Sequence, residues 1–378
     1  MANSRIFYAM HGVRLQGPSG MPGSTPKNLG FDRIQGLQSV GLTTNFSLSP
    51  IYQMGQLELY DNYEEVPEIE ISLTKVLDGH PLIYTMSVGS GSLINAANNR
   101  CGVQLGIFTD KASATTGTPQ QICQLTPAYL STVTYTFGVD DNFTEAATLV
   151  SNDKSWIPPV DWGQYGSTTH DSFDKDPQGF GIARRQQMNM DGKTGGGTVL
   201  PTGGTAGFTG ATSADGETIT ADMTKTTEGG IINGAHIQSI TITANLGREQ
   251  IKELGSRTPF IRYVNFPAEI TCEIQTSAVS GDNIGFAASA ACANPKALGN
   301  KAIKIVLCDG TTFDLGRRNK LTSVSYAGGD TGGGNATLTY SYQTFNDFYH
   351  IPGTGFAVNV RRDPVIIEDT LDNTILNP

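Results

Sequence analysis

"LQSVGLTTNF", residues 37–46, is echoed two hundred residues later by "IQSITITANL", residues 237–246, and this likeness decides the fold. With the same offset, residues 37–67 align with 237–267 without a gap. The identical pairs, which we take as the residues that define the repeat, are Gln38/Gln238, Ser39/Ser239, Thr43/Thr243, Asn45/Asn245, Ile51/Ile251, Gly55/Gly255, Tyr63/Tyr263 and Pro67/Pro267. Farther on, "LSTVTY" (130–135) matches "LTSVSY" (321–326). A period this long is too large for a solenoid or propeller, so the chain is interpreted as one domain duplicated.

Alternating apolar and polar residues predict that each copy is built of β-strands. In 237–244, Gln238, Ile240, Ile242 and Ala244 share one face, whereas the matching strand of the first copy carries a slip near Val40. Further strands are expected at 68–76, 103–109, 131–139, 268–276, 302–309, 321–328 and 336–345.

A short helix is predicted after the first strand of each copy. In "SPIYQMG" (49–55), Ser49 is an N-cap, Pro50 the first helical residue and Gly55 the left-handed stop. "GREQIKELG" (247–255) holds better helix formers and ends at the equivalent glycine. Pro67 and Pro267 are expected at the start of the strands that follow, because proline cannot donate to a β-ladder.

These patterns predict a mainly β protein with two tandem antiparallel domains, each with one short helix. The domains are expected at 1–156 and 236–350, separated by a Gly/Thr-rich insertion at 157–235 and followed by a C-terminal arm at 351–378. The Gly/Thr-rich middle is either an ordered arm that reaches a neighbouring subunit or a flexible linker.

Composition excludes several function classes. The net charge of −10 over 378 residues opposes a nucleic-acid grip, although nucleic acid can still pass without being held. No run approaches the about 18 apolar residues of a membrane span, and the first residues lack the apolar core of a secretory signal, so we expect a soluble protein with no membrane span. The five cysteines show no metal-binding spacing and are expected to be reduced, partly buried thiols of a cytoplasmic protein.

Catalytic motifs are missing from the sequence. The five histidines lie outside nucleophile-elbow and zinc-binding spacings, and the glycine-rich stretches lack the lysine and following helix of a phosphate-binding loop. Neighbouring acids such as Glu64 and Glu65 do not by themselves form the separated carboxylate pair of a glycosidase. We therefore predict no enzymatic activity, no cofactor and no metal site.

The two copies differ in charge after the first strand. The first copy has an acidic run without a base, made of Glu58, Asp61, Glu64, Glu65, Glu68 and Glu70. The matching 258–270 stretch holds only Arg262 and Glu269 as charged residues. The acids, Glu269 included, form either a solvated loop or the lining of a channel wall that must not attract a polyanion.

The chain resembles the tail tube proteins of tailed bacteriophages. The resemblance rests on "GLQSVGLTTNFSLSPIYQMGQLELYDNYEEVPEIEISL" (36–73) and on "DDNFTEAATLVSNDKSW" (140–156), and it leaves the Gly/Thr-rich middle uncovered. It implies tube-type β-barrel or sandwich domains with a flanking helix, whose sheets join edge to edge into rings. Stacked rings form a channel through which genomic DNA passes without specific binding.

Duplication fits this family, because three chains with two domains each can close a pseudo-sixfold ring. The resemblance implies a non-enzymatic protein of the virion tail, assembled in the host cytoplasm. Its implied partners are copies of itself, the tape measure, the tail terminator, the baseplate hub and, in a contractile tail, the sheath. A baseplate hub or other tail-end ring remains an alternative within the class. A β-rich adhesin or receptor-binding module is the alternative from another class.

Overall fold

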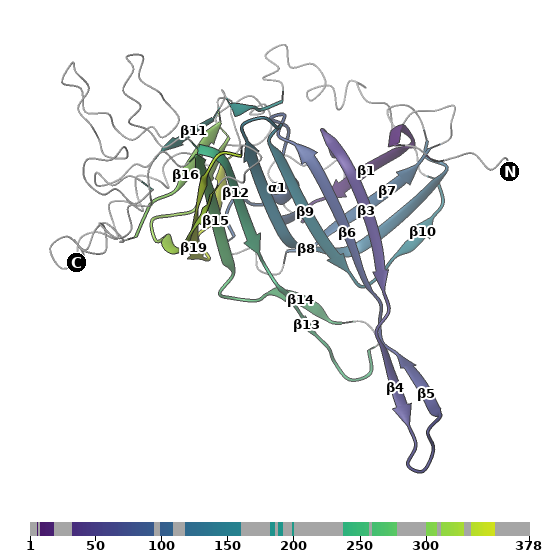
Figure 1. Ribbon diagram of the computed structural model, residues 1–378. Helices are drawn as coiled ribbons and strands as arrows, with labels where there is room; N and C mark the ends of the chain where they lie inside the picture. Colours follow the sequence, from purple (N-terminus) through teal and green to yellow (C-terminus); the bar gives the residue numbers. More distant parts are fainter. Residues whose placement is uncertain are drawn as a thin grey trace, which may run out of the picture.

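The protein is described by a computed structural model that covers residues 6, 8–18, 32–93, 99–108, 118–159, 182–185, 188–191, 199, 237–256, 259–277, 300–307, 311–328 and 334–351. The described part is mainly β, as the sequence predicts, and is dominated by one large antiparallel sheet (Figure 1). We refer to the described residues within 8–157 as the first repeat and those within 188–351 as the second repeat. No described helix has the length and apolar character required to cross a membrane.

The first repeat holds the strands β1 (His11–Gln16), β2 (Asp32–Arg33), β3 (Leu37–Asn45), β4 (Leu48–Tyr52), β5 (Leu59–Glu64), β6 (Glu68–Val76), β7 (Cys101–Ile107), β8 (Gln121–Gly138), β9 (Thr144–Ser151) and β10 (Ser155–Ile157), with the 3-10 turn η1 (Tyr8–Met10) and the helix α1 (Ile83–Val88). β3, β6, β9 and β8 lie side by side in that order. The long strand β8 also pairs with β7, from which the sheet continues through β1 to β2.

The second repeat holds β11 (Met188–Asp191), β12 (Ile237–Asn245), β13 (Arg248–Ile251), β14 (Ile261–Val264), β15 (Glu269–Ser277), β16 (Lys304–Leu307), β17 (Thr312–Asp314), β18 (Lys320–Ala327), β19 (Thr337–Phe345) and β20 (Tyr349–Ile351). β12, β15, β19 and β18 repeat the order of β3, β6, β9 and β8. A separate sheet runs β11–β16–β17–β20. The predicted strands are therefore present, and β11 lies within the range that the sequence assigns to the insertion.

The two repeats agree in register as well as in strand order. The ladder between β3 and β6 shifts between Leu37 and Ser39, and the ladder between β12 and β15 shifts between Ile237 and Ser239. The slip that the sequence predicts near Val40 is therefore present two residues earlier.

A second irregularity also recurs. The ladder between β8 and β9 shifts between Leu130 and Thr132, and the ladder between β18 and β19 shifts between Leu321 and Ser323. One difference remains: β8 is continuous, whereas its counterpart is divided into β17 and β18.

Both predicted helices are wrong, because the segments that follow β3 and β12 are hairpins. Residues 49–55 lie in β4 and its turn, and residues 247–255 lie in β13 and its turn. Segments this short gain little as isolated helices, while pairing with β5 or β14 satisfies their backbone groups. Gly55 and Gly255 do adopt the expected left-handed backbone, each with φ of 88°, but they serve the hairpin turns.

The described helix, α1, lies between β6 and β7, and a buried carboxylate holds its beginning. Glu145 on β9 accepts hydrogen bonds from the backbone N–H groups of Ile83 (2.7 Å) and Tyr84 (3.0 Å), which have no partner within the helix. The Tyr135 hydroxyl donates to the same carboxylate at 3.0 Å. Burial raises the pKa of Glu145. The corresponding segment of the second repeat, 278–299, lies outside the described residues.

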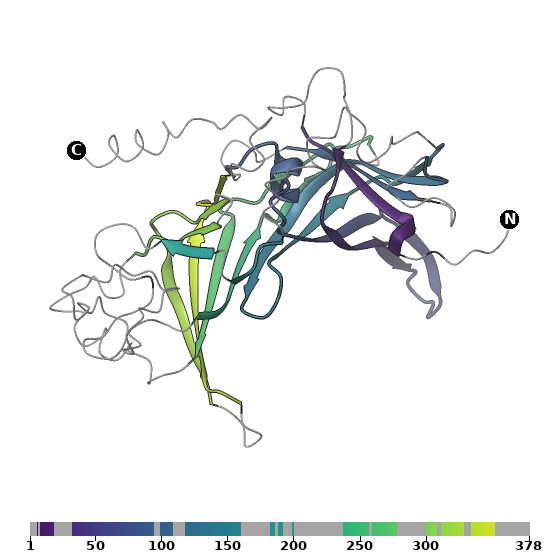
Figure 2. The ribbon, with the colours of Figure 1, turned by 90° about the horizontal axis from the view of Figure 1, so that it is seen from above.

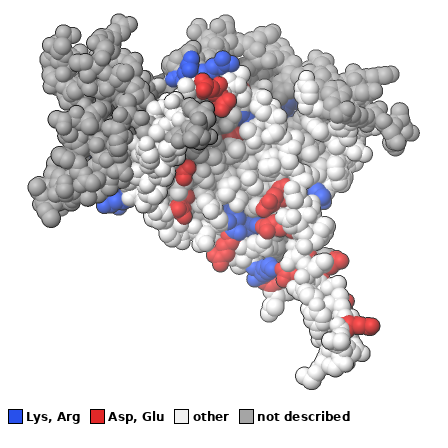
Figure 3. All heavy atoms as spheres, viewed as in Figure 1, with Lys and Arg blue, Asp and Glu red and all other residues white. Residues whose placement is uncertain are grey.

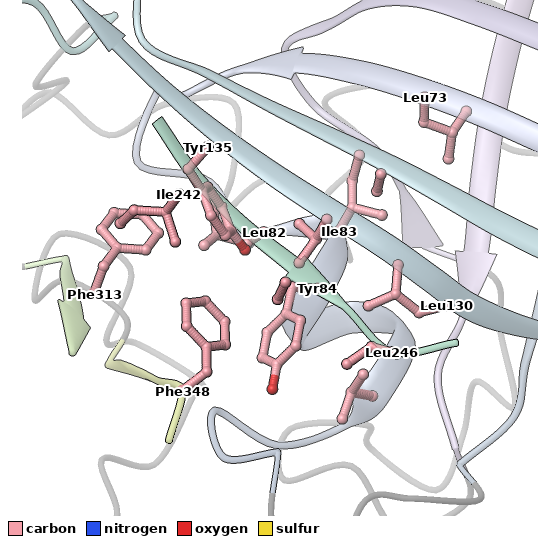
Figure 4. Packing of buried hydrophobic residues seen from close by; sticks show 14 of the residues in the cluster. Leu73, Leu82, Ile83, Tyr84, Leu130, Tyr135, Ile242, Leu246, Phe313 and Phe348 are labelled. Carbon is pink, nitrogen blue, oxygen red and sulfur yellow. The ribbon is translucent and has the colours of Figure 1, made fainter. Parts of the chain in front are cut away.

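One hydrophobic core extends through both repeats (Figure 4). Ile240 and Ile242 on β12 point into it, which confirms the predicted alternation of that strand. Phe313 and Phe348 of the second repeat pack against Tyr135 of the first, with ring centroids 4.6 and 6.0 Å from it. Because their apolar faces are shared, the repeats do not have separate cores.

Candidate assembly interface

The two repeats are joined edge to edge by antiparallel pairing of β8 with β12. The ladder runs from Gly138 opposite Ser239 to Thr132 opposite Asn245. Its outward face is polar, and the hydroxyl oxygens of Thr134 and Thr243 lie 3.2 Å apart. Figure 2 shows the consequence: the green and yellow strands of the second repeat continue the blue and purple sheet of the first.

The inward face of this junction is apolar. Tyr135 lies opposite Ile242 and Phe137 opposite Ile240, and all four side chains are buried. Burial of such side chains contributes about 1.5–3 kcal/mol each relative to exposure. The junction is therefore a core-forming contact with the packing of a domain interior.

The strands β3 and β18 each keep one open edge at an end of the same sheet. Within the described residues β3 pairs with β6 alone, and β18 pairs with β19 alone. β3 is the counterpart of β12, and β18 is the counterpart of the part of β8 to which β12 binds. An open edge is a template for another strand. The edges of β3 and β18 are equivalent to those of β12 and β8, which pair with each other within the chain.

The hairpin β13–β14 docks against the first repeat through ion pairs. Arg262, only 2% exposed, donates from Nη1 to Oε1 of Glu68 at 2.8 Å and from Nε to Oδ1 of Asn152 at 2.8 Å. Lys252 Nζ lies 3.2 Å from Oε2 of Glu65 at the rim of the contact. The buried guanidinium has two partners from the first repeat, which fixes the position of the hairpin.

The base of the same hairpin is buried against β8. Arg248 donates from Nε to the carbonyl oxygen of Leu130 at 2.6 Å, and its guanidinium lies 5.7 Å from the centre of the Tyr129 ring. Burial lowers the pKa of Arg248 to about 10. Beside it, Leu246 is 1% exposed and its backbone N–H donates to the carbonyl of Ser131 at 2.9 Å.

The hairpin β4–β5 projects away from the sheet instead (Figure 1). Its large apolar side chains are exposed, namely Phe46, Leu48, Ile51, Tyr52, Met54, Leu57, Leu59, Tyr60 and Tyr63. Figure 3 shows a mostly uncharged surface over it, with acidic groups along one side and mixed charges where the hairpins meet the body. Exposed apolar groups in this number are typical of an interaction surface.

The seven predicted channel acids do not gather in one place. Glu58, Asp61 and Glu64 are exposed on or beside β5 of the free hairpin. Glu65 and Glu68 lie at its base and pair with bases of the second repeat. Glu70 and Glu269 lie on the outward, polar face of the sheet, where Glu269 accepts from Nε2 of Gln343 at 2.7 Å. That any of them faces a channel remains a prediction.

The residues that define the repeat have positions that fit backbone roles. Gln38 donates to the carbonyl of Gly36, Ser239 donates to Gln275, and Asn245 accepts from the N–H of Gly247. The remaining members lie as follows: Gln238, Ser39 and Asn45 in β12 or β3, Tyr63 and Tyr263 in β5 and β14, Pro67 and Pro267 just before β6 and β15. A role for these residues in strand and hairpin geometry remains a prediction.

The described cysteines form no disulfide with one another. Cys101, Cys123 and Cys272 are free and buried, and burial raises the pKa of Cys101 and Cys272 to about 12. Cys292 and Cys308 lie outside the described residues. No group of three or more His, Cys, Asp or Glu side chains among the described residues is placed to hold a metal ion.

Sequence reasoning missed the ion pairs that join the repeats. Arg262 and Glu68 each belong to a charge pattern in the sequence, but their contact depends on β12 lying beside β8. A usable signal is that the hairpin of the second copy carries bases, among them Arg248, Lys252 and Arg262, whereas the aligned hairpin of the first copy carries acids and no base. This complementarity accounts for part of the charge difference between the copies.

No protein-family model and no curated protein matches the chain. Among solved structures, it is similar to the anti-feeding prophage baseplate, symmetrised sixfold, at 11% identity and a TM-score of 0.29, covering 41% of this chain and 97% of that chain. It is similar to the tube-terminating cap of the anti-feeding prophage at 13% identity and a TM-score of 0.30, covering 42% and 94%. A sheath/tube terminator of the PVC extracellular contractile injection system gives 15% and 0.30, covering 42% and 99%. TM-scores of this size carry no argument about function, which rests on the strand pairing of the chain itself.

Proposed function

We propose that the chain is a non-enzymatic virion structural protein, a tail tube subunit that assembles with itself into stacked rings around a DNA-conducting channel. The observation that carries the proposal is the β8–β12 junction. It joins two similar units edge to edge and leaves the equivalent edges, β3 and β18, open. One open edge is equivalent to β12 and the other to β8, so the sheet can add further copies of the chain head to tail by the same type of strand pairing.

Head-to-tail contacts close into a ring when the rotation per unit divides a full turn. Three chains would supply six units and a ring with true threefold and pseudo-sixfold symmetry. Such a ring pairs both of these edges, which removes the aggregation hazard that β3 and β18 present in a single chain.

The outward face of the sheet supports a channel that conducts DNA without holding it. That face carries hydroxyl and amide groups such as Thr134, Thr243 and Gln343, with the acids Glu70 and Glu269 among them. We place this face toward the lumen, because few bases and several acids give DNA no counter-charge to bind. The partners in the virion tail would be tape measure, terminator and hub proteins, and sheath if the tail contracts. Buried free thiols accord with assembly in the host cytoplasm.

Negative-stain electron microscopy of the purified full chain tests the proposal. We expect hollow rings that stack into tubes as protein concentration rises. Single rings that never stack would instead favour a baseplate hub or other tail-end ring. Monomers without rings at every salt and protein concentration would overturn the proposal and favour an adhesin or receptor-binding module.

A further inference from the structure

The edges β3 and β18 carry the side-chain pattern of the junction that the chain forms internally. Residue numbers in β12 exceed those in β3 by 200, and numbers in β18 exceed those in β8 by 191, as Leu130 and Leu321 show. Transferring the internal pairs by these offsets places Leu42 opposite Tyr326, Thr43 opposite Ser325, Thr44 opposite Val324 and Asn45 opposite Ser323.

This register keeps each face of the sheet uniform. Leu42 and Tyr326 take the places of Ile242 and Tyr135 on the apolar face. Thr43 and Ser325 take the places of Thr243 and Thr134 on the polar face, whose hydroxyls lie 3.2 Å apart. A shift by one residue would set Tyr326 against a polar-face residue, so the side-chain pattern excludes it.

Exposure identifies the same surface independently. Leu246 is 1% exposed in the internal junction, whereas its counterpart Phe46 is 65% exposed. Tyr135 is fully buried, whereas its counterpart Tyr326 is 60% exposed. Large apolar groups are therefore exposed at the positions whose counterparts the internal junction buries.

The docked hairpin β13–β14 and the free hairpin β4–β5 carry different kinds of side chain. The bases Arg248, Lys252 and Arg262 of the docked hairpin correspond to Leu48, Tyr52 and Asn62 in β4–β5, which contains no lysine or arginine. On the receiving side, Asn152 of the first repeat corresponds to Phe345, which is exposed at the end of β19. The bases of the internal ion pairs thus have apolar or neutral groups at the equivalent positions of the open contact. On the receiving side Glu68 corresponds to Glu269, which would face Asn62 in place of an arginine, so this ion pair has no equivalent.

We propose that β3 of one chain pairs with β18 of a second copy in this register, with Phe46 buried as Leu246 is and hairpin β4–β5 held by apolar contacts in place of ion pairs. The inference rests on the proposed function, to which it adds the register and the chemistry of the contact between chains. Salt screens ion pairs but leaves apolar contact largely intact, so the contact between chains is expected to survive high salt.

Cysteine cross-linking of the full chain tests the register. Thr43→Cys combined with Ser325→Cys should give disulfide-linked dimers and trimers on mild oxidation, because the template hydroxyls lie close enough for a disulfide. The matched control, Thr43→Cys with Ser323→Cys, keeps the same face but lies two residues out of register, and should cross-link about tenfold less. Each single variant controls for the native thiols.

The outcomes separate the register from the function. Rings in the microscope without a Thr43/Ser325 cross-link, or with the control cross-linking equally, overturn the register and leave the tube proposal standing. Neither rings nor cross-links overturn both.

A second measurement tests the chemistry. Cross-link yield should change less than about twofold between about 0.05 and 1 M NaCl, while a tenfold fall would indicate ionic contacts instead. Phe46→Ser should prevent assembly and leave the melting temperature of the monomer unchanged, whereas Phe46→Leu, which installs the residue of the second repeat, should assemble. Assembly of Phe46→Ser at the level of the unaltered chain would overturn the role of this side chain.

Discussion

The two hairpins share a backbone plan and differ in what they touch. They follow the equivalent strands β3 and β12, and each turns at a glycine with φ of 88°. β13–β14 lies against the first repeat and anchors Arg262 between Glu68 and Asn152, whereas β4–β5 is exposed along its length. The two repeats therefore share strand order and register, whereas the surface side chains of each hairpin differ according to what the hairpin contacts.

The largest difference between the repeats is expected from an acidic substitution at equivalent positions of β12 and β3. Ile240→Asp puts a charge in the buried internal junction and should cost several kcal/mol, enough to abolish soluble yield. Val40→Asp, at the open edge and only half-buried, should leave a folded monomer that does not assemble. Melting curves and soluble yield check the first effect, and microscopy checks the second. Equal melting temperatures for the two variants would contradict the distinction between a buried internal junction at β12 and an open edge at β3.

The buried His350 on β20, where the first repeat has Ile157, should make the stability of the chain depend on pH. His350 is buried, and burial, with the charge of Lys75 adding to it, lowers its pKa to about 3. The unfolded chain takes up this proton near its ordinary pKa of about 6.5, so between about pH 6.5 and 3 stability should fall on acidification by up to about 1.4 kcal/mol per pH unit. His350→Ile installs the residue of the first repeat, Ile157, and should flatten this dependence. Melting temperatures from about pH 7 to 4 measure it, and an unaltered acid slope would contradict the role of His350.

Arg262→Ala should undock β13–β14. The change removes two charge-assisted contacts and leaves the half-exposed Glu68 without its cationic partner, so we expect a loss of about 1–3 kcal/mol in the free energy of unfolding. Asn62→Ala, at the equivalent position of the free hairpin, should leave the monomer unchanged. Denaturant unfolding measures both, and similar losses in the two variants would remove the distinction between docked and free hairpins.

The smallest effect is expected at the rim. Lys252 and Glu65 form an ion pair with both side chains largely exposed, so Lys252→Ala should change stability by less than about 1 kcal/mol. The same unfolding experiment at low and high salt checks it. A loss as large as that of Arg262→Ala would mean that the hairpin is held at its rim.

The strand frame could be predicted from the sequence, but the contacts between repeats could not. The alternation of Ile240 and Ile242 is a local signal, and burial of one sheet face enforces it. The hairpins were mistaken for helices because a short segment with a proline start and a glycine stop fits both structures. Arg262 and Glu68 are far apart in sequence, and only the pairing of β12 with β8 brings them together. A channel-facing role for the acids is a property of the assembly, which one chain's sequence does not encode locally.

The placement of β8 and β12 in one chain has a kinetic and mass-action consequence. Their encounter is intramolecular, so this junction forms at a fixed effective concentration and with a rate independent of how much protein the cell contains. A contact between β3 and β18 of separate chains is second order and dissociates on dilution. In a ring of three chains, half of the six junctions would thus form without regard to supply, and tube growth would respond to chain concentration through the other half alone.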